Sequence, residues 1–500
     1  LSIQDIMELL VAITNLSLSC YPERLDYMDQ ILIYCKDKCV EYADSTDLHS
    51  KTTEEHLMTL LLAPIQQYDS ILTLLMLQNY NTLFEQQSYN TRRRLALAIV
   101  TSMLSKGTLI ETPEDVHTVL ELCNVLLQKR NESTTFYYEE DVTDDQLYIA
   151  KIIHLFQSKE NDKQFLLLSA TRRQLGEDKD QIKYTFPSLI TSALKLSHRY
   201  QKQVEQNEIW EKKTIALFRF IHQVISILYK QCEHMTGSCL QYFLMAGQSA
   251  DVSGFEDLAY EFFVQGFNVY EESISDSKAQ YQAIIFIIGS LYQTIGFSKE
   301  NYTSLITRAA LHGSKLLKKP DRCRAVYLAS HLWRNKNKNE NENGNENQIE
   351  SQNEGENENE DGNRVDNLLQ QQNEVENKRI LECLQKGLKI ADSCMDPVVN
   401  LELFVEILNQ CIFYFQQNND KITTKYINGL IDMIKSSLSN LDEADEYPFT
   451  SSSSTLLQQN SGLAMAKYVR RQFTCTLKYL KHYQELESDN EENKYKDIVL

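Results

Sequence analysis

The chain of 500 residues is long enough for about three average domains or for one elongated repeat array. Hydrophobic residues make up 42% and charged residues 24%, as in ordinary globular proteins, while the scarcity of glycine (15) and proline (7) favours helices over a turn-rich β-sandwich or barrel. The formal net charge of -20 argues against binding to nucleic acid, because phosphate recognition needs clustered Lys and Arg.

Prolines indicate where helices begin. Six of the seven precede or open an apolar-periodic run: Pro22, Pro64, Pro113, Pro187, Pro320 and Pro397. A proline in the first helical turn costs no hydrogen bond, because the first amides of a helix have no partner within it. Thr112 and Asp396, each directly before a proline, are predicted N-caps.

The stretch AYEFFVQGFNVYEESISDSKAQ, residues 259–280, predicts the end of one helix, a tight polar corner and the start of a second helix. Apolar residues before and after the corner recur at helical spacing, so each helix should face a core. Ser253-Gly254-Phe255-Glu256 is the predicted capping box of the first helix, and Gly296 the predicted left-handed C-cap of the second.

This pattern continues along the chain and predicts an all-α fold, a HEAT-like α-solenoid of stacked antiparallel helix pairs. The repeat is degenerate, with units of about 40 residues. The solenoid should occupy 1–334 and continue over 376–441.

Four further segments complete the predicted organisation. Residues 335–375 form an Asn/Glu-rich insertion with too few apolar residues to offset its ordering entropy, so it should be disordered. Residues 442–462 are a Ser-rich flexible connector, 463–482 a terminal helix and 483–500 an acidic tail.

Eleven scattered cysteines, many at apolar helical positions, indicate free thiols in a reducing compartment, so we expect a cytosolic protein. No continuous apolar run approaches the roughly 20 residues of a membrane span, and the nearest is AIIFIIGSLY at 283–292. The chain begins without Met and in mid-pattern, as expected for a fragment of a longer protein.

Signals of catalysis or metal binding are weak. The sequence lacks the phosphate-binding loop, the nucleophile elbow of hydrolases and the zinc-protease helix motif. Cys35 and Cys39 share a helix face without further ligands, and Cys232, His234 and Cys239 lie at a helix end. The basic clusters 92–94, 172–173 and 318–319 are short and are interpreted as solvated helix ends. We therefore predict no enzyme, no cofactor and no metal, with an all-α enzyme as the alternative of another class.

Six separated blocks, in order along the chain, resemble the C-terminal half of the vacuolar protein sorting protein 35 family, the large bridging subunit of retromer. They are CYPERLDYMD (20–29), WEKK (210–213), SISDSKAQ (273–280), SKLLKKPDRCRAV (314–326), CLQKGLKIADSCMDP (383–397) and LFVEILN (403–409). Other α-solenoid trafficking adaptors and nuclear transport receptors remain alternatives.

The resemblance implies a noncatalytic scaffold in endosome-to-Golgi and endosome-to-plasma-membrane recycling, cytoplasmic and peripheral on endosomes. It implies that the small metallophosphoesterase-like subunit, vacuolar protein sorting protein 29, sits in the solenoid groove. The WASH complex, Rab GTPase regulators and self-association are further implied partners, with membrane contact only through the coat. The family's Pro-Arg-Leu-Tyr-Leu motif for the arrestin-like subunit is absent from this sequence.

The resemblance and the helical corner together locate a predicted partner-binding region. Its residues are Trp210, Tyr260, Phe263, Ser275, Asp276, Lys278, Gln280, Tyr281, Lys318, Lys319, Asp321, Arg324 and Trp333. Polar members should fix the register of a partner and aromatic members exclude water. The alternative is that the polar members only cap helices and turn the chain.

Overall fold

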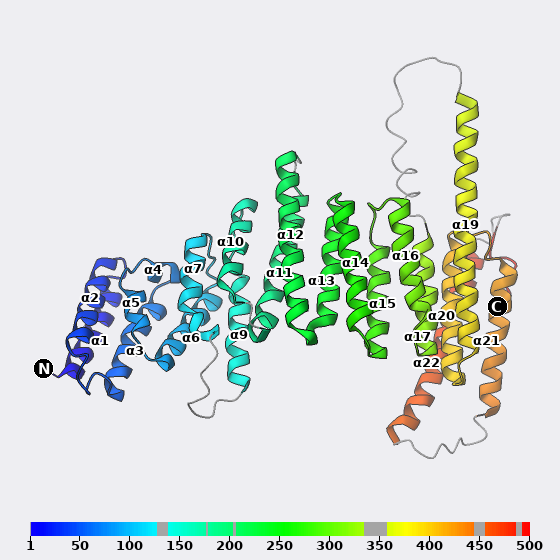
Figure 1. The fold of residues 1–500 in the computed structure, drawn as a ribbon. Coiled ribbons are helices and arrows are strands. Elements are labelled where there is room, and N and C mark those ends of the chain that lie inside the picture. Colours follow the sequence, from blue (N-terminus) through cyan, green and yellow to red (C-terminus); the bar gives the residue numbers. More distant parts are fainter. Residues whose placement is uncertain are drawn as a thin grey trace. The chain divides into compact units, whose positions relative to one another are not determined.

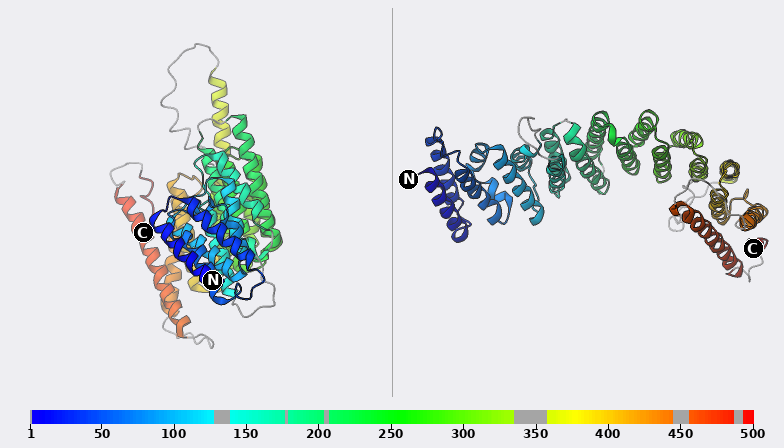
Figure 2. Two further views of the ribbon diagram at one scale, coloured as in Figure 1. Left: turned by 90° about the vertical axis from the view of Figure 1, so that its left-hand side faces the viewer. Right: turned by 90° about the horizontal axis from the view of Figure 1, so that it is seen from below.

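The computed structural model describes residues 2–127, 139–176, 179–203, 207–334, 358–444, 456–486 and 493–500. The chain forms two compact units, Leu1–Ser249 and Ala250–Leu500. Helices make up both units (Figures 1 and 2), and an isolated bridge pairs Ile110 with Phe156. The predicted all-α solenoid is confirmed within each unit.

Unit 1 is a succession of helices that pack on near neighbours, such as α1 on α2 and α3, or α11 on α9, α10 and α12. Its elements are α1 (Ile3–Cys20), α2 (Leu25–Glu41), α3 (Lys51–Gln67), α4 (Ile71–Leu75), α5 (Tyr80–Glu85), α6 (Tyr89–Lys106), α7 (Pro113–Leu122), α8 (Asn124–Leu127), α9 (Glu139–Ile153), α10 (Asn161–Gln174), α11 (Lys179–Gln201), α12 (Glu208–Gln231), η1 (Glu233–Met235) and α13 (Thr236–Val252), which crosses the unit boundary.

Unit 2 contains α14 (Glu256–Ser273), α15 (Ser277–Tyr292), α16 (Lys299–Ser314), α17 (Lys319–Ala329), η2 (Ser330–Trp333), α19 (Glu358–Asp392), α20 (Pro397–Gln416), α21 (Thr424–Ala444) and α22 (Leu456–Leu486). From α14 to α21, each helix packs on the next one along the chain, and α15, α17, α20 and α22 also form a row in which each contacts the next. We name these four helices the row.

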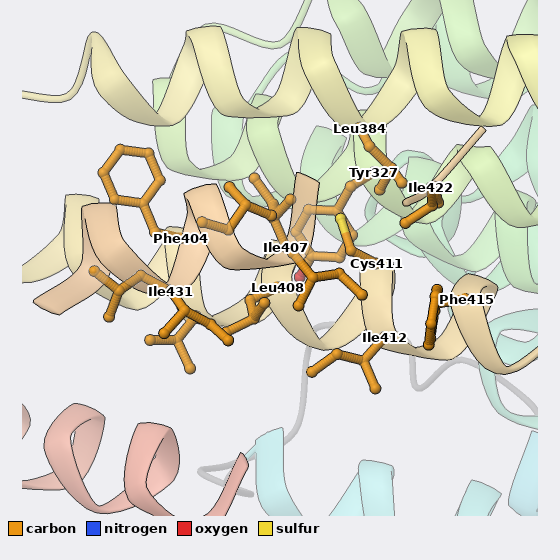
Figure 3. Packing of buried hydrophobic residues seen from close by; sticks show 14 of the residues in the cluster. Tyr327, Leu384, Phe404, Ile407, Leu408, Cys411, Ile412, Phe415, Ile422 and Ile431 are labelled. Carbon is orange, nitrogen blue, oxygen red and sulfur yellow. The ribbon is translucent and has the colours of Figure 1, made fainter. Parts of the chain in front are cut away.

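The core of unit 2 centres on α20. Leu403, Ile407, Leu408 and Cys411 are fully buried on this helix and share a core cluster with side chains from α17, α19, α21 and α22. Figure 3 shows Ile407, Leu408 and Cys411 among neighbours that include Tyr327 of α17, Leu384 of α19 and Ile431 of α21. Because apolar residues lie on all sides of α20, it is buried by neighbours on several faces, as expected for the central helix of a stack.

Two helices, α1 and α20, are long and apolar enough for a membrane span by length and composition, although the sequence contains no continuous apolar run of that length. Both helices are apolar on average over their length, even though short polar stretches such as Asn409-Gln410 interrupt them. Half of the α20 window is buried inside unit 2, as in a core helix of a stack.

The proline prediction is right for four helices and wrong for two. Pro22 lies in the turn before α2. Pro113, Pro320 and Pro397 lie in the first turns of α7, α17 and α20. Pro64 and Pro187 lie inside α3 and α11. Buried apolar neighbours on both sides of each proline hold these helices together, so packing outweighs the local cost of a missing amide.

The predicted caps around α14 and α15 are partly wrong. Thr112 and Asp396 cap their helices as predicted. The N-cap of α14 is Phe255, preceded by Gly254 at φ 83°, so there is no capping box from Ser253. Helix α15 ends at Tyr292, and Gly296 has a different role: a Cβ there would lie 3.1 Å from the Asp251 carbonyl oxygen. Asp251 carboxylate oxygens accept the Ile295 and Gly296 amides at 2.8 and 2.9 Å.

Helix boundaries near the two low-complexity segments also differ from the prediction. Helix α19 begins at Glu358, inside the segment 335–375 predicted to be disordered, because Val365, Leu368 and Leu369 already have helical spacing in the sequence. Helix α22 spans Leu456–Leu486, longer than the predicted 463–482. The remaining parts of these predictions, 335–357 and 445–455, lie outside the described residues.

The basic clusters are engaged in intramolecular contacts. Arg93 binds the carboxylate of buried Asp145 through two hydrogen bonds of 2.6 and 2.7 Å. Arg172 lies over the Phe186 ring. The prediction of solvated helix ends is therefore wrong for these two arginines, which link neighbouring helices.

Candidate partner-binding surface

The helices of the row run in the same direction. Arg324 of α17 pairs with Glu406 of α20, and His331, in η2 directly after α17, meets Gln410 of α20 at 2.7 Å. Arg334 then donates to Gln417 at 2.7 Å. Because residue numbers rise together on both sides, α17 and α20 are parallel, and their N-terminal ends lie at one edge of unit 2.

Three polar corners meet this edge. They are residues 274–278 before α15, 315–319 before α17 and 393–396 before α20, which we name together the corner edge. Lys319 Nζ donates to the Ser393 carbonyl oxygen at 2.7 Å and so ties the second corner to the third. Figure 1 shows the third corner at the lower end of α19.

The first corner is rigid. Asp276 is the N-cap of α15 and its carboxylate accepts the Ala279 amide at 2.8 Å. Gln280 Nε2 donates to the Ile274 carbonyl oxygen at 2.9 Å, which closes the turn from the other side. Ser275 and Lys278 are exposed. The polar residues of this corner therefore both shape the turn and leave two side chains open to solvent.

Two large apolar side chains protrude from the other corners. Leu317 is 76% exposed and Met395 is 98% exposed. The Lys318 side chain beside Leu317 is exposed as well. An exposed apolar side chain on a rigid turn gains most when a partner covers it. Sequence reasoning missed both, although each lies within a block that carries the family resemblance.

A half-buried charge cluster lies one turn above the corner edge. The Arg324 guanidinium contacts Glu402 at 3.1 Å and Glu406 at 3.0 Å, and the Tyr327 hydroxyl donates to Glu406 at 2.8 Å. Burial opposes the charged form of Arg324, but the hydrogen bonds and charge of Glu406, with Glu402, hold its pKa above the ordinary value.

Tyr281 on α15 faces the same cluster. Its pKa is raised, first by burial and then by the Asp321 and Glu406 carboxylates, while Arg324 acts in the opposite direction. The structure thus brings together three predicted residues, Tyr281, Asp321 and Arg324. It adds Glu402 and Glu406, the two charged residues of α20, whose four-residue spacing was the available signal.

Other predicted residues lie apart from this region. Phe263 is completely buried and packs edge-on against Phe297 at 5.8 Å between ring centroids, so it is not available to a partner. The Tyr260 hydroxyl lies 3.5 Å from Ser304, and Trp333 lies beneath the Arg379 guanidinium at 4.4 Å. These aromatic side chains fill contacts between helices.

Trp210 belongs to unit 1. Its side chain is buried and its indole nitrogen donates to the Tyr200 carbonyl oxygen at 2.8 Å. It lines an open polar cavity of about 560 Å³ in which the Asp162 carboxylate accepts from Lys213 at 2.6 Å and from Tyr200 at 3.1 Å. The hydrogen bond from Lys213, and then that from Tyr200, hold the pKa of Asp162 low despite partial burial.

The part of the chain that the structure describes contains no group of three or more His, Cys, Asp or Glu side chains placed to hold a metal ion. All eleven cysteines are free thiols. Cys35 is buried beside Met7 Sδ at 3.8 Å. Burial raises the pKa of the Cys323 thiol to about 12.

The family model described as vacuolar protein sorting-associated protein 35 matches residues 1–437. The chain belongs to this family. It is 31% identical to the Schizosaccharomyces pombe protein of that name, over 88% of this chain and 48% of the relative. It is 30% identical to vacuolar protein sorting-associated protein 35A of Arabidopsis thaliana, over 86% of this chain and 52% of the relative.

The chain thus spans about half the length of the curated relatives it matches. Its likeness to a solved circular tandem repeat protein is weak, at a TM-score of 0.32 and 9% identity over 99% of this chain and 93% of that one.

Proposed function

We propose that this chain is a noncatalytic scaffold of the retromer coat and holds the small metallophosphoesterase-like subunit, vacuolar protein sorting protein 29, on unit 2. The proposed setting is the cytosolic face of endosomes, in recycling to the Golgi and the plasma membrane. The observation that carries the proposal is the coincidence of family membership with the corner edge, where two exposed apolar side chains stand on turns between packed helices.

The corner edge offers the partner two kinds of contact. Leu317 and Met395 supply apolar anchors that are covered on binding, and Lys278 and Lys318 supply cations at the rim. The cluster of Arg324, Glu402 and Glu406 behind it is already paired within the chain, so it keeps α17 and α20 in register. Binding therefore needs little rearrangement of the scaffold.

Titration calorimetry of the 500-residue chain with the small subunit tests the proposal. We expect a one-to-one complex with a dissociation constant below about 1 µM, or roughly 8 kcal/mol. Leu317→Asp combined with Met395→Asp should weaken binding at least about tenfold, since carboxylates would be desolvated against the partner.

The matched control is Val375→Asp, which replaces an apolar side chain of 55% exposure on α19, well away from the corner edge. It should leave binding unchanged. No heat and no co-elution at tens of micromolar would end the scaffold proposal, whereas equal affinity of the double variant would remove only the corner edge from it.

The WASH complex and Rab GTPase regulators would use other surfaces in this proposal, because a scaffold of stacked helices offers several faces at once. Pull-down of these partners by the Leu317→Asp, Met395→Asp variant separates the surfaces. We expect their binding to be retained when binding of the small subunit is lost.

A further inference from the structure

Residues 493–500, which we name the terminal segment, lie against the ends of α20, α21 and α22. Tyr495 is 2% exposed and Ile498 is 4% exposed, and both belong to the hydrophobic core cluster of unit 2. Phe415, a member of this cluster that Figure 3 labels, packs edge-on against the Tyr495 ring at 5.5 Å between centroids. On the other side, the Tyr483 ring lies 5.4 Å from Tyr495. Two side chains of the segment thus enter an apolar groove.

Side-chain amides of the helices hold the backbone of the segment. Asn428 on α21 donates through Nδ2 to the Asp497 carbonyl oxygen at 2.8 Å, and its Oδ1 accepts the Val499 amide at 2.9 Å. Gln484 on α22 donates through Nε2 to the carbonyl oxygens of Tyr495 and Ile498 at 2.9 and 2.7 Å. Hydrogen bonds to the main chain of a peptide supply affinity in recurring modes of peptide recognition.

The first charged residue of the segment adds a contact at the end of α20. Lys494 Nζ donates to the Gln416 carbonyl oxygen at 3.2 Å and to Asn418 Oδ1 at 3.0 Å. A cation at the C-terminal end of a helix is favoured by the helix dipole. The same ammonium lies 5.6 Å from the centroid of the Phe415 ring.

The segment folds as a short turn. The Ile498 amide donates to the Tyr495 carbonyl oxygen at 3.0 Å, and Asn493 Oδ1 accepts the Tyr495 amide at 2.9 Å. The turn places the aromatic and the aliphatic side chain, three positions apart, on the face toward the groove, while Lys496 and Asp497 are exposed.

We propose that α20, α21 and α22 form a peptide-binding groove, and that the terminal segment is its ligand within the same chain. The ligand class is a short turned peptide with a basic residue followed by Tyr-x-x-Ile. The inference is independent of the proposed binding of the small subunit, since it uses none of the corner-edge residues.

A segment held by two buried side chains and by amide contacts to its backbone is exchangeable, because few contacts must break together. A peptide of the same pattern offered in solution therefore competes with the terminal segment. Its dissociation constant should be on the order of 10–100 µM, as for other short peptides with few anchors.

The test measures fluorescence anisotropy of a labelled synthetic peptide with the sequence NKYKDIVL, residues 493–500, added to the full chain. In the 500-residue chain carrying Tyr495→Ala with Ile498→Ala, the groove is emptied, and the peptide should bind at least about tenfold more tightly than to the unchanged chain. A peptide with both anchors replaced by Ala should not bind.

Groove residues are tested in the same background. Adding Asn428→Ala should weaken peptide binding about tenfold, because two backbone contacts are lost. Lys425→Ala, an exposed position on the same helix, is the matched control and should have no effect. Absence of peptide binding by the emptied variant, with its helical circular dichroism intact, would overturn the proposal.

Hydrogen exchange of the unchanged chain gives a second measurement if the emptied variant fails to fold. Amides of the terminal segment should exchange at least about tenfold faster in the Asn428→Ala variant, while α20 stays protected. Equal protection of the terminal segment in both chains would show that it is an integral part of the core and would likewise overturn the proposal.

Discussion

At the scale of single residues, Asp276 caps α15 through the Ala279 amide, whereas Phe263 is buried against Phe297. Asp276 was predictable as a cap, since a short acidic side chain before a helix satisfies a free amide. Phe263 was not predictable as a core residue rather than a partner contact, because an aromatic stripe looks the same in both cases. Its packing partner Phe297 lies in the loop between α15 and α16, so this contact is not visible in the pattern of α14.

The buried and the exposed cysteine thiols should differ in reactivity. Burial raises the pKa of Cys123 and Cys323 to about 12, so at pH 8 almost none of either thiol is the reactive thiolate. Cys20 and Cys475 are exposed. We expect iodoacetamide to label these two within minutes in the folded chain and to leave the buried pair unlabelled, as read by peptide mass spectrometry.

The control for labelling is the denatured chain, in which all four thiols should react. Rising pH should increase labelling of the buried thiols only near their raised pKa, because the thiolate is the nucleophile. Rapid labelling of Cys323 at pH 8 without unfolding would contradict its burial in unit 2.

The Arg324 cluster carries a stability prediction. Arg324→Ala leaves Glu402 and Glu406, both largely buried, without their shared cation, so the free energy of unfolding should fall by about 2 kcal/mol. Arg324→Lys should recover only part of it, because an ammonium cannot reproduce the fork geometry. Urea denaturation measures both, and a loss of under about 0.5 kcal/mol would show that the pairs are well screened.

At the scale of helices, the interior of most helices was predictable from the apolar spacing. Several helix ends were not, because they depend on the conformation of a glycine or on contacts with residues distant in the sequence. The corner between α14 and α15 follows from Asp276 and from the apolar spacing on both sides. The start of α14 does not, because Gly254 turns the chain into the left-handed region and moves the cap to Phe255. Asp251 then replaces a C-cap glycine by binding amides 44 and 45 residues away, a contact that no local pattern contains.

Two helical glycines give opposite predictions for the same substitution. A Cβ at Gly387 on α19 would meet Ile407 Cδ1 at 3.5 Å, an ordinary contact, so Gly387→Ala should stabilise the chain by about 0.5–1 kcal/mol through helix propensity. A Cβ at Gly313 on α16 would lie 3.2 Å from Ala325 Cβ on α17.

Gly313→Ala should therefore destabilise by about 1 kcal/mol, since the overpacking of two helices exceeds the gain in propensity. Thermal unfolding of both variants is the measurement, and each serves as the other's control. A rise in melting temperature for both would mean that α16 and α17 separate freely.

At the scale of the whole molecule, the all-α solenoid was predictable because the helical period and the scarcity of glycine and proline agree along the chain. The division into two units was not, since its boundary falls inside α13 and no composition change marks it. The corner edge was located only through the family resemblance, because Leu317 and Met395 look like ordinary loop residues until parallel helices bring their corners to one edge.

In a stack of helices each helix contacts only its neighbours, so the loss of one contact should destabilise only the helices around it. Unit 1 offers a test of this. Asp145→Ala leaves Arg93 half-buried without its carboxylate between α6 and α9, so the local free energy of unfolding should fall by about 3 kcal/mol. Amide hydrogens should exchange faster in α6, α8 and α9, which contact one another, and at an unchanged rate in α19 to α21.

Equally faster amide exchange over the whole chain would contradict this prediction and indicate one cooperative unfolding transition. Glu55→Ala, at an exposed pair with Lys51, is the matched control in the same unit and should have little effect.

The parallel course of α17 and α20 has a mechanical consequence. Arg324, His331 and Arg334 reach across to Glu406, Gln410 and Gln417 at three successive levels, through contacts of 3.0, 2.7 and 2.7 Å. Sliding one helix along the other would stretch all three at once, whereas purely apolar surfaces can slip over each other by small rotamer changes. This pair of helices should thus resist shear and transmit a pulling force along its length without changing shape.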